Sequence, residues 1–196
     1  MGYFFAVIRI GMYALVFGVF VVIGACGHVL FFMSPSWLLK WIAFFAQMWA
    51  RVTCLVLNIQ VQIEGNASIK PGSLIVANHV GSPDIFVLGA TFKGFFVSKT
   101  EVADWPLFSC LAKLGKTVFT DRSKRHQVKA LIGEIKQRLN SDQCVILFPE
   151  AQATDGTDVL PFKSAIFESA VLARRPVVPV QIRYHDDHQP TIAYYG

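Results

Sequence analysis

The first part of the chain is dominated by uninterrupted apolar sequence. From Ile10 to Met33 there is no Lys, Arg, Asp or Glu, and the run is long enough to cross a bilayer, which takes about 20 apolar residues. Ser34-Pro35-Ser36 then breaks the chain, and Trp37 to Leu57 is predicted to form a second apolar helix with only two basic residues. We therefore predict an N-terminal membrane-associated helical hairpin over residues 1–56, which either dips into one leaflet or spans the membrane twice.

A different pattern begins at the end of the second helix. Apolar and polar residues alternate over 57–64, which predicts a half-buried strand, and short apolar runs then alternate with segments of helical spacing. Strands are predicted at Ser73–Ala77, Phe95–Ser98, Thr117–Thr120, Cys144–Phe148 and Val177–Ile182, with helices at Pro83–Phe92, Pro106–Gly115, Lys124–Asn140 and Lys163–Arg174. Such alternation is typical of an α/β fold with a mainly parallel sheet flanked by helices. We expect one domain over residues 57–196. The sequence stops inside or just after a strand, which leaves open that this domain is truncated at its C-terminus.

Composition supports a membrane setting. Hydrophobic residues make up 54% of the chain and charged residues 16%, and the mean hydropathy is +0.47. The net charge of +5 suits anionic lipid headgroups or nucleic acid. Because no nucleic-acid-binding motif accompanies it, we expect lipid and no nucleic acid. The four cysteines are widely spaced in apolar contexts, so we expect buried, reduced thiols and neither disulfides nor a metal site.

The candidate chemistry lies after the first predicted strand. His79 and Asp84 stand five positions apart at a predicted turn between a strand and a helix. They can meet only if the chain bends between them, and Gly81 is expected to permit that bend. Asp84 would then hold one imidazole nitrogen and leave the other to take a proton from a hydroxyl. The simpler alternative is a histidine that caps a turn and an aspartate that begins a helix.

Other polar residues follow other predicted strands. Lys99, Arg122 and Glu150 fall at strand ends, as His79 does. In parallel sheets ligands bind beyond the carboxyl ends of the strands. The four residues are therefore expected to converge on one rim.

Four ordered blocks of this sequence resemble the glycerolipid acyltransferases, the family that includes 1-acylglycerol-3-phosphate acyltransferase. His79 and Asp84 match the family's H-x4-D block, Gly115 to Arg122 its second block, Phe148-Pro149-Glu150 the start of its third, and Val178-Pro179-Val180 its fourth. Leu160 to Ser164 is similar to the stretch that follows the third block in many members. The resemblance identifies residues 57–196 as an acyltransferase domain and the N-terminal helices as the membrane anchor of bacterial members.

This resemblance implies a membrane-bound O-acyltransferase. A fatty acyl group would pass from acyl-CoA or acyl carrier protein to the free hydroxyl of a lysophospholipid, converting 1-acylglycerol-3-phosphate to phosphatidic acid. His79 would act as the base and Asp84 as its orienting acid. Arg122, with Lys99, would hold the anionic headgroup. Glu150 would bind the acceptor or position Arg122, and Pro179 would shape the floor of the site. No metal and no cofactor is implied beyond the acyl donor, the lysolipid and membrane lipids, and the implied location is the cytoplasmic face of a bacterial inner membrane.

The third block departs from the family pattern. Members usually continue Phe-Pro-Glu with Gly-Thr and then Arg or Ser, whereas this chain continues with Ala151-Gln152-Ala153. The loss of the glycine removes backbone freedom, and the loss of the polar residues removes phosphate contacts. Members that acylate lyso-ornithine lipid share the later Asp155-Gly156 and Leu160–Lys163 pattern, so that acceptor is the alternative. A thioesterase and a non-catalytic lipid-binding module are the competing classes; no G-x-S-x-G elbow is present.

Overall fold

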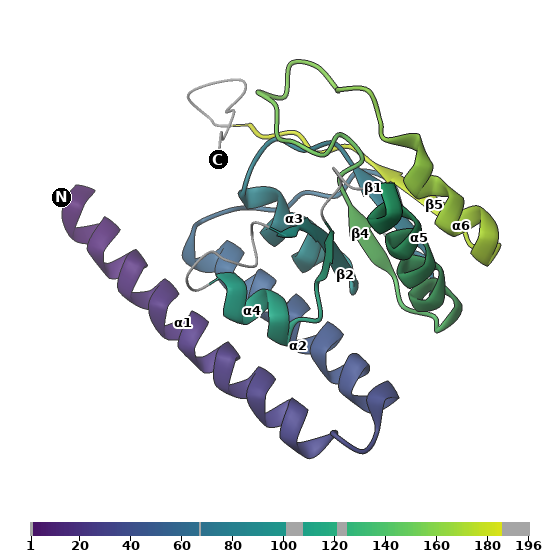
Figure 1. The fold of residues 1–196 in the computed structure, drawn as a ribbon. Coiled ribbons are helices and arrows are strands. Elements are labelled where there is room, and N and C mark those ends of the chain that lie inside the picture. The colour runs from purple at the N-terminus through teal and green to yellow at the C-terminus, as the bar shows by residue number, and fades with distance from the viewer. Residues whose placement is uncertain (1, 67, 101–107, 121–124, 186–196) are drawn as a thin grey trace. The chain divides into compact units, whose positions relative to one another are not determined.

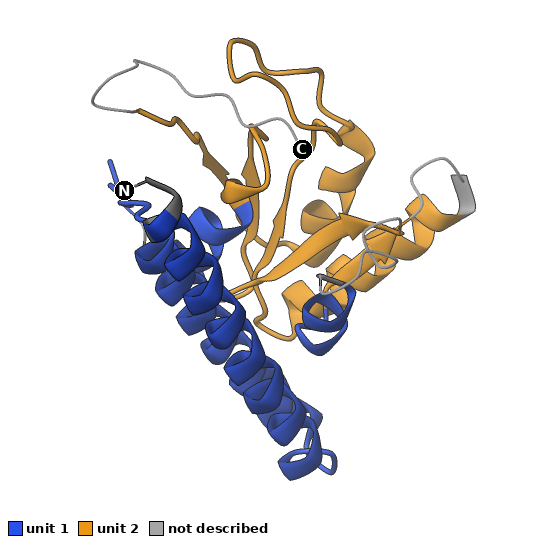
Figure 2. Ribbon diagram, turned by 90° about the vertical axis from the view of Figure 1, so that its left-hand side faces the viewer, with its two compact units in different colours: residues 1–67, 85–93, 105–116 blue, residues 68–84, 94–104, 117–196 orange. Residues whose placement is uncertain are grey.

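The computed structural model describes residues 2–66, 68–100, 108–120 and 125–185. They divide into two compact units, drawn in two colours in Figure 2. The first unit comprises residues 1–67, 85–93 and 105–116, and the second comprises residues 68–84, 94–104 and 117–196. Helices therefore dominate the first unit, and the second contains the sheet.

The first unit is built on two long helices, α1 (Gly2–Leu30) and α2 (Pro35–Val56), joined by the turn that the sequence predicts. Figure 1 shows them as a hairpin. Within the described residues, α1 alone is long and apolar enough to cross a membrane, over Ala6–Leu30 with a mean hydropathy of 2.4. This apolar helix is compatible with membrane association. A hydrogen bond of 3.3 Å from the indole N–H of Trp41 on α2 to the carbonyl of Ile23 on α1 joins the two helices.

Helix α2 differs from α1 because two of its polar side chains bond the end of a neighbouring helix. The amide of Gln47, which is 6% exposed, donates to the carbonyls of Ala90 and Thr91 at 3.2 and 3.1 Å. Arg51 Nε also donates to the carbonyl of Ala90 at 3.0 Å. These carbonyls end α3 (Pro83–Thr91), where helix geometry leaves them without partners in the helix itself. The polar residues of α2 thus cap a neighbouring helix.

The strand predicted over 57–64 is wrong. In the structure, residues 59–64 run without strand pairing. Ile59 and Val61 pack against a buried cluster of Ala50, Cys54, Phe86 and Ala90. The alternation therefore records an extended segment in which Ile59 and Val61 are partly buried against helices, at the two-residue spacing of a strand, while Leu57 and Ile63 are exposed.

The second unit contains a five-stranded parallel sheet in the order β3-β2-β4-β1-β5 (Figure 1). Its strands are β1 (Leu74–Ala77), β2 (Phe95–Lys99), β3 (Val118–Thr120), β4 (Val145–Leu147) and β5 (Val177–Val180), and every pairing is parallel. The central strands β1 and β4 are buried throughout, as expected for apolar runs covered on both faces. The predicted fold class is confirmed.

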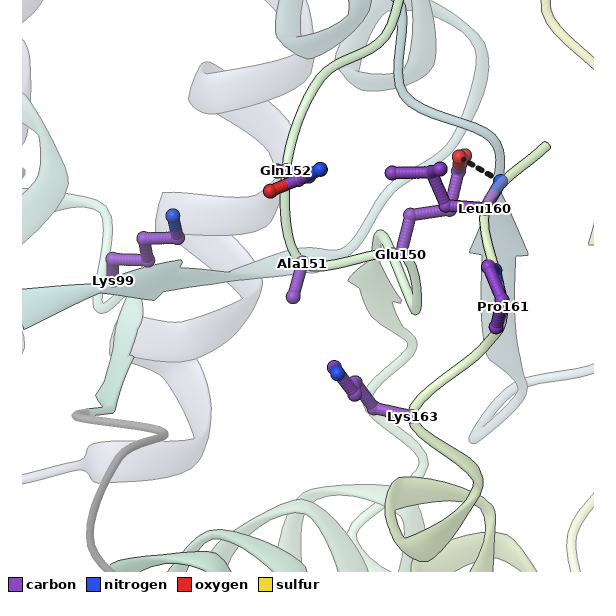
Figure 3. Close-up of a pocket in the computed structure, with 7 residues that line it drawn as sticks. All are labelled: Lys99, Glu150, Ala151, Gln152, Leu160, Pro161 and Lys163. Carbon is purple, nitrogen blue, oxygen red and sulfur yellow. Dashed lines mark hydrogen bonds between the residues drawn. The ribbon is translucent and has the colours of Figure 1, made fainter. Parts of the chain in front are cut away.

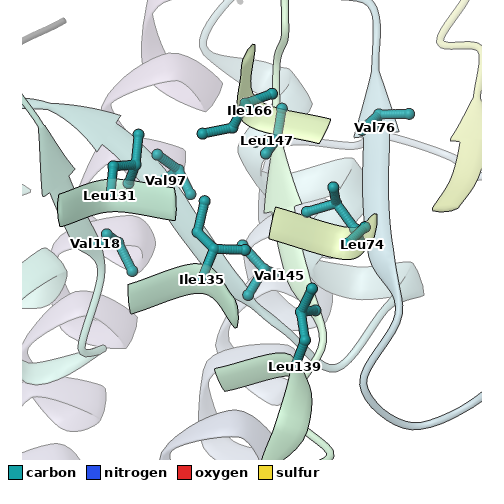
Figure 4. Close-up of a cluster of buried hydrophobic side chains, with 11 residues drawn as sticks. Leu74, Val76, Val97, Val118, Leu131, Ile135, Leu139, Val145, Leu147 and Ile166 are labelled. Carbon is teal, nitrogen blue, oxygen red and sulfur yellow. The ribbon is translucent and has the colours of Figure 1, made fainter. Parts of the chain in front are cut away.

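Helices α5 (Arg125–Asn140) and α6 (Glu168–Ala173), with the short 3-10 turn η2 (Ser164–Phe167), pack on this sheet. Figure 4 shows the core that they share with the strands. Ile135 and Leu139 are fully buried and lie one turn apart on α5, as their spacing predicts. Deleting such a side chain to alanine typically costs about 2–5 kcal/mol, so this face anchors α5.

The cysteines are only partly as expected. All four are free, but Cys26 and Cys110, on α1 and α4 (Phe108–Leu114), are exposed, and only Cys54 and Cys144 are buried. Burial raises the pKa of the Cys54 thiol. Apolar neighbours in sequence therefore do not guarantee burial on a helix, since successive residues point in different directions.

Candidate active site

The structure brings His79 and Asp84 together. His79 follows β1, Asp84 lies in the first turn of α3, and Nδ1 of the imidazole lies 2.7 Å from Oδ2 of the carboxylate. The imidazole side chain is 22% exposed and the carboxylate side chain is fully buried. The pair therefore has one protected member and one member that solvent or a substrate can reach.

The bend between the two residues is held by Asp84 itself. Oδ2 also accepts hydrogen bonds from the backbone N–H groups of Val80 and Gly81, at 2.7 and 3.1 Å. Gly81 was expected to permit this bend, and it does so without a positive φ. Asp84 therefore both stabilises the turn and holds the histidine.

These contacts fix the imidazole tautomer. Oδ2 accepts from two backbone amides, as an ionised carboxylate oxygen does, so the imidazole must donate to it through Nδ1–H. The remaining nitrogen, Nε2, then carries the lone pair of the neutral ring. Such a ring can take a proton from a hydroxyl that reaches Nε2.

A stacked aromatic ring further restricts the histidine. The rings of His79 and Phe148 are nearly parallel, with centroids 4.0 Å apart and an interplanar angle of 13°. Phe148 directly follows β4, which pairs with β1. The sequence marked Phe148 as the start of the third block but gave no sign of this contact.

Glu150 also belongs to the histidine's surroundings, as a buried bridge between two loops. It is 3% exposed. Its Oε1 accepts from the backbone N–H of His79 at 2.8 Å, and its Oε2 accepts from the backbone N–H of Leu160 at 2.7 Å. On the other side, the backbone N–H of Thr154 donates to the carbonyl of His79 at 2.9 Å. The backbone of His79 is thus held at both its N–H and its carbonyl.

Ala151 adopts the conformation that glycine would favour. Its φ is 68°, in the left-handed region, which costs a residue with a Cβ about 1–2 kcal/mol. The chain therefore keeps the sharp turn after Glu150 even though it lacks the family's glycine. The expected loss of backbone freedom appears as local strain at this position.

A cavity of about 460 Å³ lies beside this turn (Figure 3). Its lining residues are Lys99, Glu150, Ala151, Gln152, Leu160, Pro161 and Lys163. The Lys99 and Lys163 side chains extend toward Ala151 from opposite sides in Figure 3. The backbone N–H of Lys163 donates to the carbonyl of Pro149 at 2.9 Å, which fixes where this lysine leaves the chain. With both oxygens of Glu150 bonded to backbone amides, the two lysines give the cavity a cationic character suited to an anion.

The other predicted residues are placed differently. Arg122 lies outside the residues that the structure describes. Pro179 lies on β5 opposite Val76, with an exposed side chain, and it does not line the cavity. Its missing N–H is tolerated on this edge strand. Among the described residues no three His, Cys, Asp or Glu side chains gather as metal ligands do.

Among the described residues, Lys163 and Tyr184 are polar residues of the site that the sequence interpretation missed. Lys163 lines the cavity, and the hydroxyl of Tyr184 donates to Oδ1 of Asp84 at 2.6 Å. Lys163 lies in a stretch that already resembled the family, so a cationic role for it could have been suspected. Tyr184 lies 100 positions after Asp84, and no local pattern links the two.

The sequence is similar to those of known acyltransferases. A lyso-ornithine lipid O-acyltransferase from Rhizobium meliloti is 36% identical over 125 residues, covering 64% of this chain and 43% of that protein. A 1-acyl-sn-glycerol-3-phosphate acyltransferase from Neisseria gonorrhoeae is 35% identical over 132 residues, covering 67% of this chain and 52% of that protein. The chain spans about half the length of these curated relatives.

The fold has a counterpart among solved structures. The crystal structure of the 1-acyl-sn-glycerophosphate (LPA) acyltransferase PlsC from Thermotoga maritima aligns with a TM-score of 0.58 and 22% identity. The alignment covers 86% of this chain and 73% of that one, so the likeness is one of fold. The family profile described as Acyltransferase matches residues 58–183, which is more than half of the chain and includes His79, Asp84 and Glu150. The chain therefore belongs to the acyltransferase family.

Proposed function

We propose that this chain transfers a fatty acyl group from a thioester to the free hydroxyl of a lysolipid. The observation that carries the proposal is the His79–Asp84 pair, in which a buried carboxylate fixes Nδ1–H and leaves Nε2 to act as a base. Its family membership supports the same reaction class. The acyl donor is acyl-CoA or acyl carrier protein.

The reaction proceeds in one displacement. Nε2 of His79 takes the proton of the acceptor hydroxyl as that oxygen attacks the thioester carbonyl. The carbon–sulfur bond breaks, the thiolate leaves and takes up a proton, and the new ester remains on the lipid. Asp84 stabilises the imidazolium that forms during this transfer. The route uses no covalent acyl-enzyme, no metal and no cofactor.

The acceptor headgroup occupies the cavity beside Ala151. Lys99 and Lys163 hold its anionic group there by charge-assisted hydrogen bonds. For Arg122 we retain the headgroup-binding role that the resemblance implies. Glu150 lines this cavity and also bonds the backbone of His79, so it aligns the headgroup with the base. A direct contact between Glu150 and the acceptor is part of the same proposal. Pro179 shapes the sheet edge beside β1.

The preferred acceptor is 1-acylglycerol-3-phosphate, giving phosphatidic acid, and the alternative is lyso-ornithine lipid. Relatives named for each reaction are similarly identical to this chain. The two lysines of the cavity suit a phosphate, whereas the absence of the family's polar residues after Glu150 removes phosphate contacts and keeps lyso-ornithine lipid as the alternative. A carboxylate needs fewer cationic partners than a phosphate does.

The proposed location is the cytoplasmic face of a bacterial inner membrane. The apolar helix α1 would keep the chain in the bilayer, with α2 beside it in the hairpin. An acceptor lipid could then reach His79 without leaving the membrane.

The test is to incubate the purified full chain with acyl-CoA or acyl carrier protein carrying a labelled acyl group. Parallel samples contain 1-acylglycerol-3-phosphate, lyso-ornithine lipid or no acceptor. We expect the label in diacylated lipid only where an acceptor is present. Label in free fatty acid regardless of acceptor would indicate a thioesterase, and label that stays on the donor throughout would indicate a binding module.

A further inference from the structure

The two oxygens of the Asp84 carboxylate have different partners. Oδ2 accepts from His79 Nδ1 at 2.7 Å, and Oδ1 accepts from the hydroxyl of Tyr184 at 2.6 Å. The carboxylate is fully buried, so these contacts are made away from water. A short O–H···O bond to a carboxylate is among the stronger hydrogen bonds in proteins.

A specific contact places Tyr184. The side chain of Asn78, the residue before His79, bonds the backbone of Ile182 in both directions: its Nδ2 donates to the Ile182 carbonyl at 3.1 Å, and its Oδ1 accepts from the Ile182 N–H at 2.7 Å. Just before, β5 ends where Val180 pairs with Ala77 of β1. The segment after β5 is thus hydrogen-bonded to the segment that carries His79. Tyr184 lies two residues after Ile182 and is positioned by these bonds.

We propose that Tyr184 is a positioning residue for the base. Two backbone N–H groups already hold Oδ2 beside Nδ1, and the Tyr184 hydroxyl holds Oδ1 as well, so the plane of the carboxylate is fixed at both oxygens. The hydrogen bond from Tyr184 also makes the Asp84 carboxylate a weaker base. The proton on Nδ1 of His79 therefore stays on the ring when Nε2 takes up a proton from the acceptor. Tyr184 acts through Asp84 and His79, and this role rests on the function proposed above.

The first experiment is a double-mutant cycle with the full chain in detergent, comparing Tyr184→Phe, Asp84→Asn and the double variant with the wild type. We expect Tyr184→Phe to lower kcat by about 3- to 10-fold, with KM for donor and acceptor changed by less than about 2-fold. On the Asp84→Asn background the same change should lower kcat by less than about 2-fold, because no carboxylate remains to be held. Equal losses on both backgrounds, or no loss in Tyr184→Phe alone, would overturn the proposal.

The second experiment is independent of turnover. In a ¹⁵N-histidine-labelled chain, the resonance of the His79 Nδ1–H proton reports its bond to Asp84. Tyr184→Phe should shift or broaden this resonance, and Tyr13→Phe, which removes a hydroxyl on α1, should leave it unchanged. An unmoved resonance in Tyr184→Phe would overturn the positioning role. A wild-type chain that acylates no lysolipid but shows the expected shift would instead refute the proposed function alone.

Discussion

Glu150 and His79 are joined through the backbone of the histidine, whose N–H donates to Oε1 of the buried carboxylate at 2.8 Å. The other oxygen holds Leu160 at 2.7 Å, in the loop that leads to Lys163. A single carboxylate therefore links the base to the wall of the cationic cavity. This relationship explains how the third sequence block can matter for activity even if Glu150 never contacts substrate.

Replacing Glu150 with Gln should disturb both links, because the amide presents an N–H₂ group to one of two backbone N–H donors. We expect a loss of about 1–3 kcal/mol in the free energy of unfolding and at least a roughly 10-fold lower kcat, since small misplacements of a base are costly. Thermal unfolding and acyl transfer measure the two effects. The matched control is Glu134→Gln, which breaks an exposed contact to Arg138 and should change stability by under about 0.5 kcal/mol. Wild-type stability and turnover in Glu150→Gln would show that the bridge is dispensable.

Replacing Ala151 with Gly should relieve the strain of its left-handed backbone. We expect the free energy of unfolding to rise by about 0.5 kcal/mol, because relief of about 1–2 kcal/mol of strain is partly offset by the greater freedom of glycine in the unfolded chain. The control is the same change at Ala130, an exposed residue inside α5, where it should cost about 1 kcal/mol. Opposite signs at the two positions are the expected result. Similar losses at both would contradict the left-handed conformation of residue 151.

Replacing Lys163 with Met should weaken binding of an anionic acceptor. We expect KM for 1-acylglycerol-3-phosphate or lyso-ornithine lipid to rise about 3- to 10-fold, the scale of one partly exposed charged contact, while KM for an uncharged monoacylglycerol stays the same. Lys163→Arg should retain most of the affinity. Lys129→Met removes an exposed lysine of α5 that does not line the cavity and should leave every KM unchanged. An equal rise in KM for charged and uncharged acceptors would contradict a role of Lys163 in binding the anionic group.

Replacing Gly27 with Ala should disturb the N-terminal hairpin, because the added Cβ would clash with the indole ring of Trp41. We expect a loss of about 1–3 kcal/mol, the scale of overpacking, seen as a lower midpoint of thermal unfolding in detergent. Gly18 has open space around the position of its Cβ, so Gly18→Ala should be neutral or stabilise α1 by up to about 1 kcal/mol. Equal midpoints for the two variants would contradict the close packing of α1 on Trp41.

The sequence predicts most of the fold because the sheet is parallel and its strands are apolar runs. The runs that became β1 and β4 are buried on every residue, so their sequence carries a clear signal. Residues 57–64 mislead for a physical reason: Ile59 and Val61 are partly buried against helices at the two-residue spacing of a strand. Periodicity identifies which side chains are buried, but it does not identify the partner that covers them.

The residues of the site likewise fall into those that the sequence could predict and those that it could not. His79, Lys99 and Glu150 could be found because each follows or ends a predicted strand, and the topology of a parallel sheet brings such ends to one edge. Asp84 could be found because it stands five positions after His79 at a predicted turn. Tyr184 could not be found, since its contact with Asp84 depends on where the chain runs after β5. The sequence predicted Glu150 as a site residue but did not predict its hydrogen bonds to two backbone amides. Every residue except proline has a backbone N–H, so residue types do not indicate such contacts.

The most direct measurement compares wild-type and His79→Ala chains for the rate at which labelled acyl groups pass from the thioester donor to a lysolipid. Circular dichroism and thermal unfolding would first establish that both chains fold alike. We predict that the rate falls at least ~100-fold in His79→Ala, the usual scale for removal of a general base. A folded His79→Ala chain that acylates the lysolipid at a rate close to that of the wild type would contradict the account.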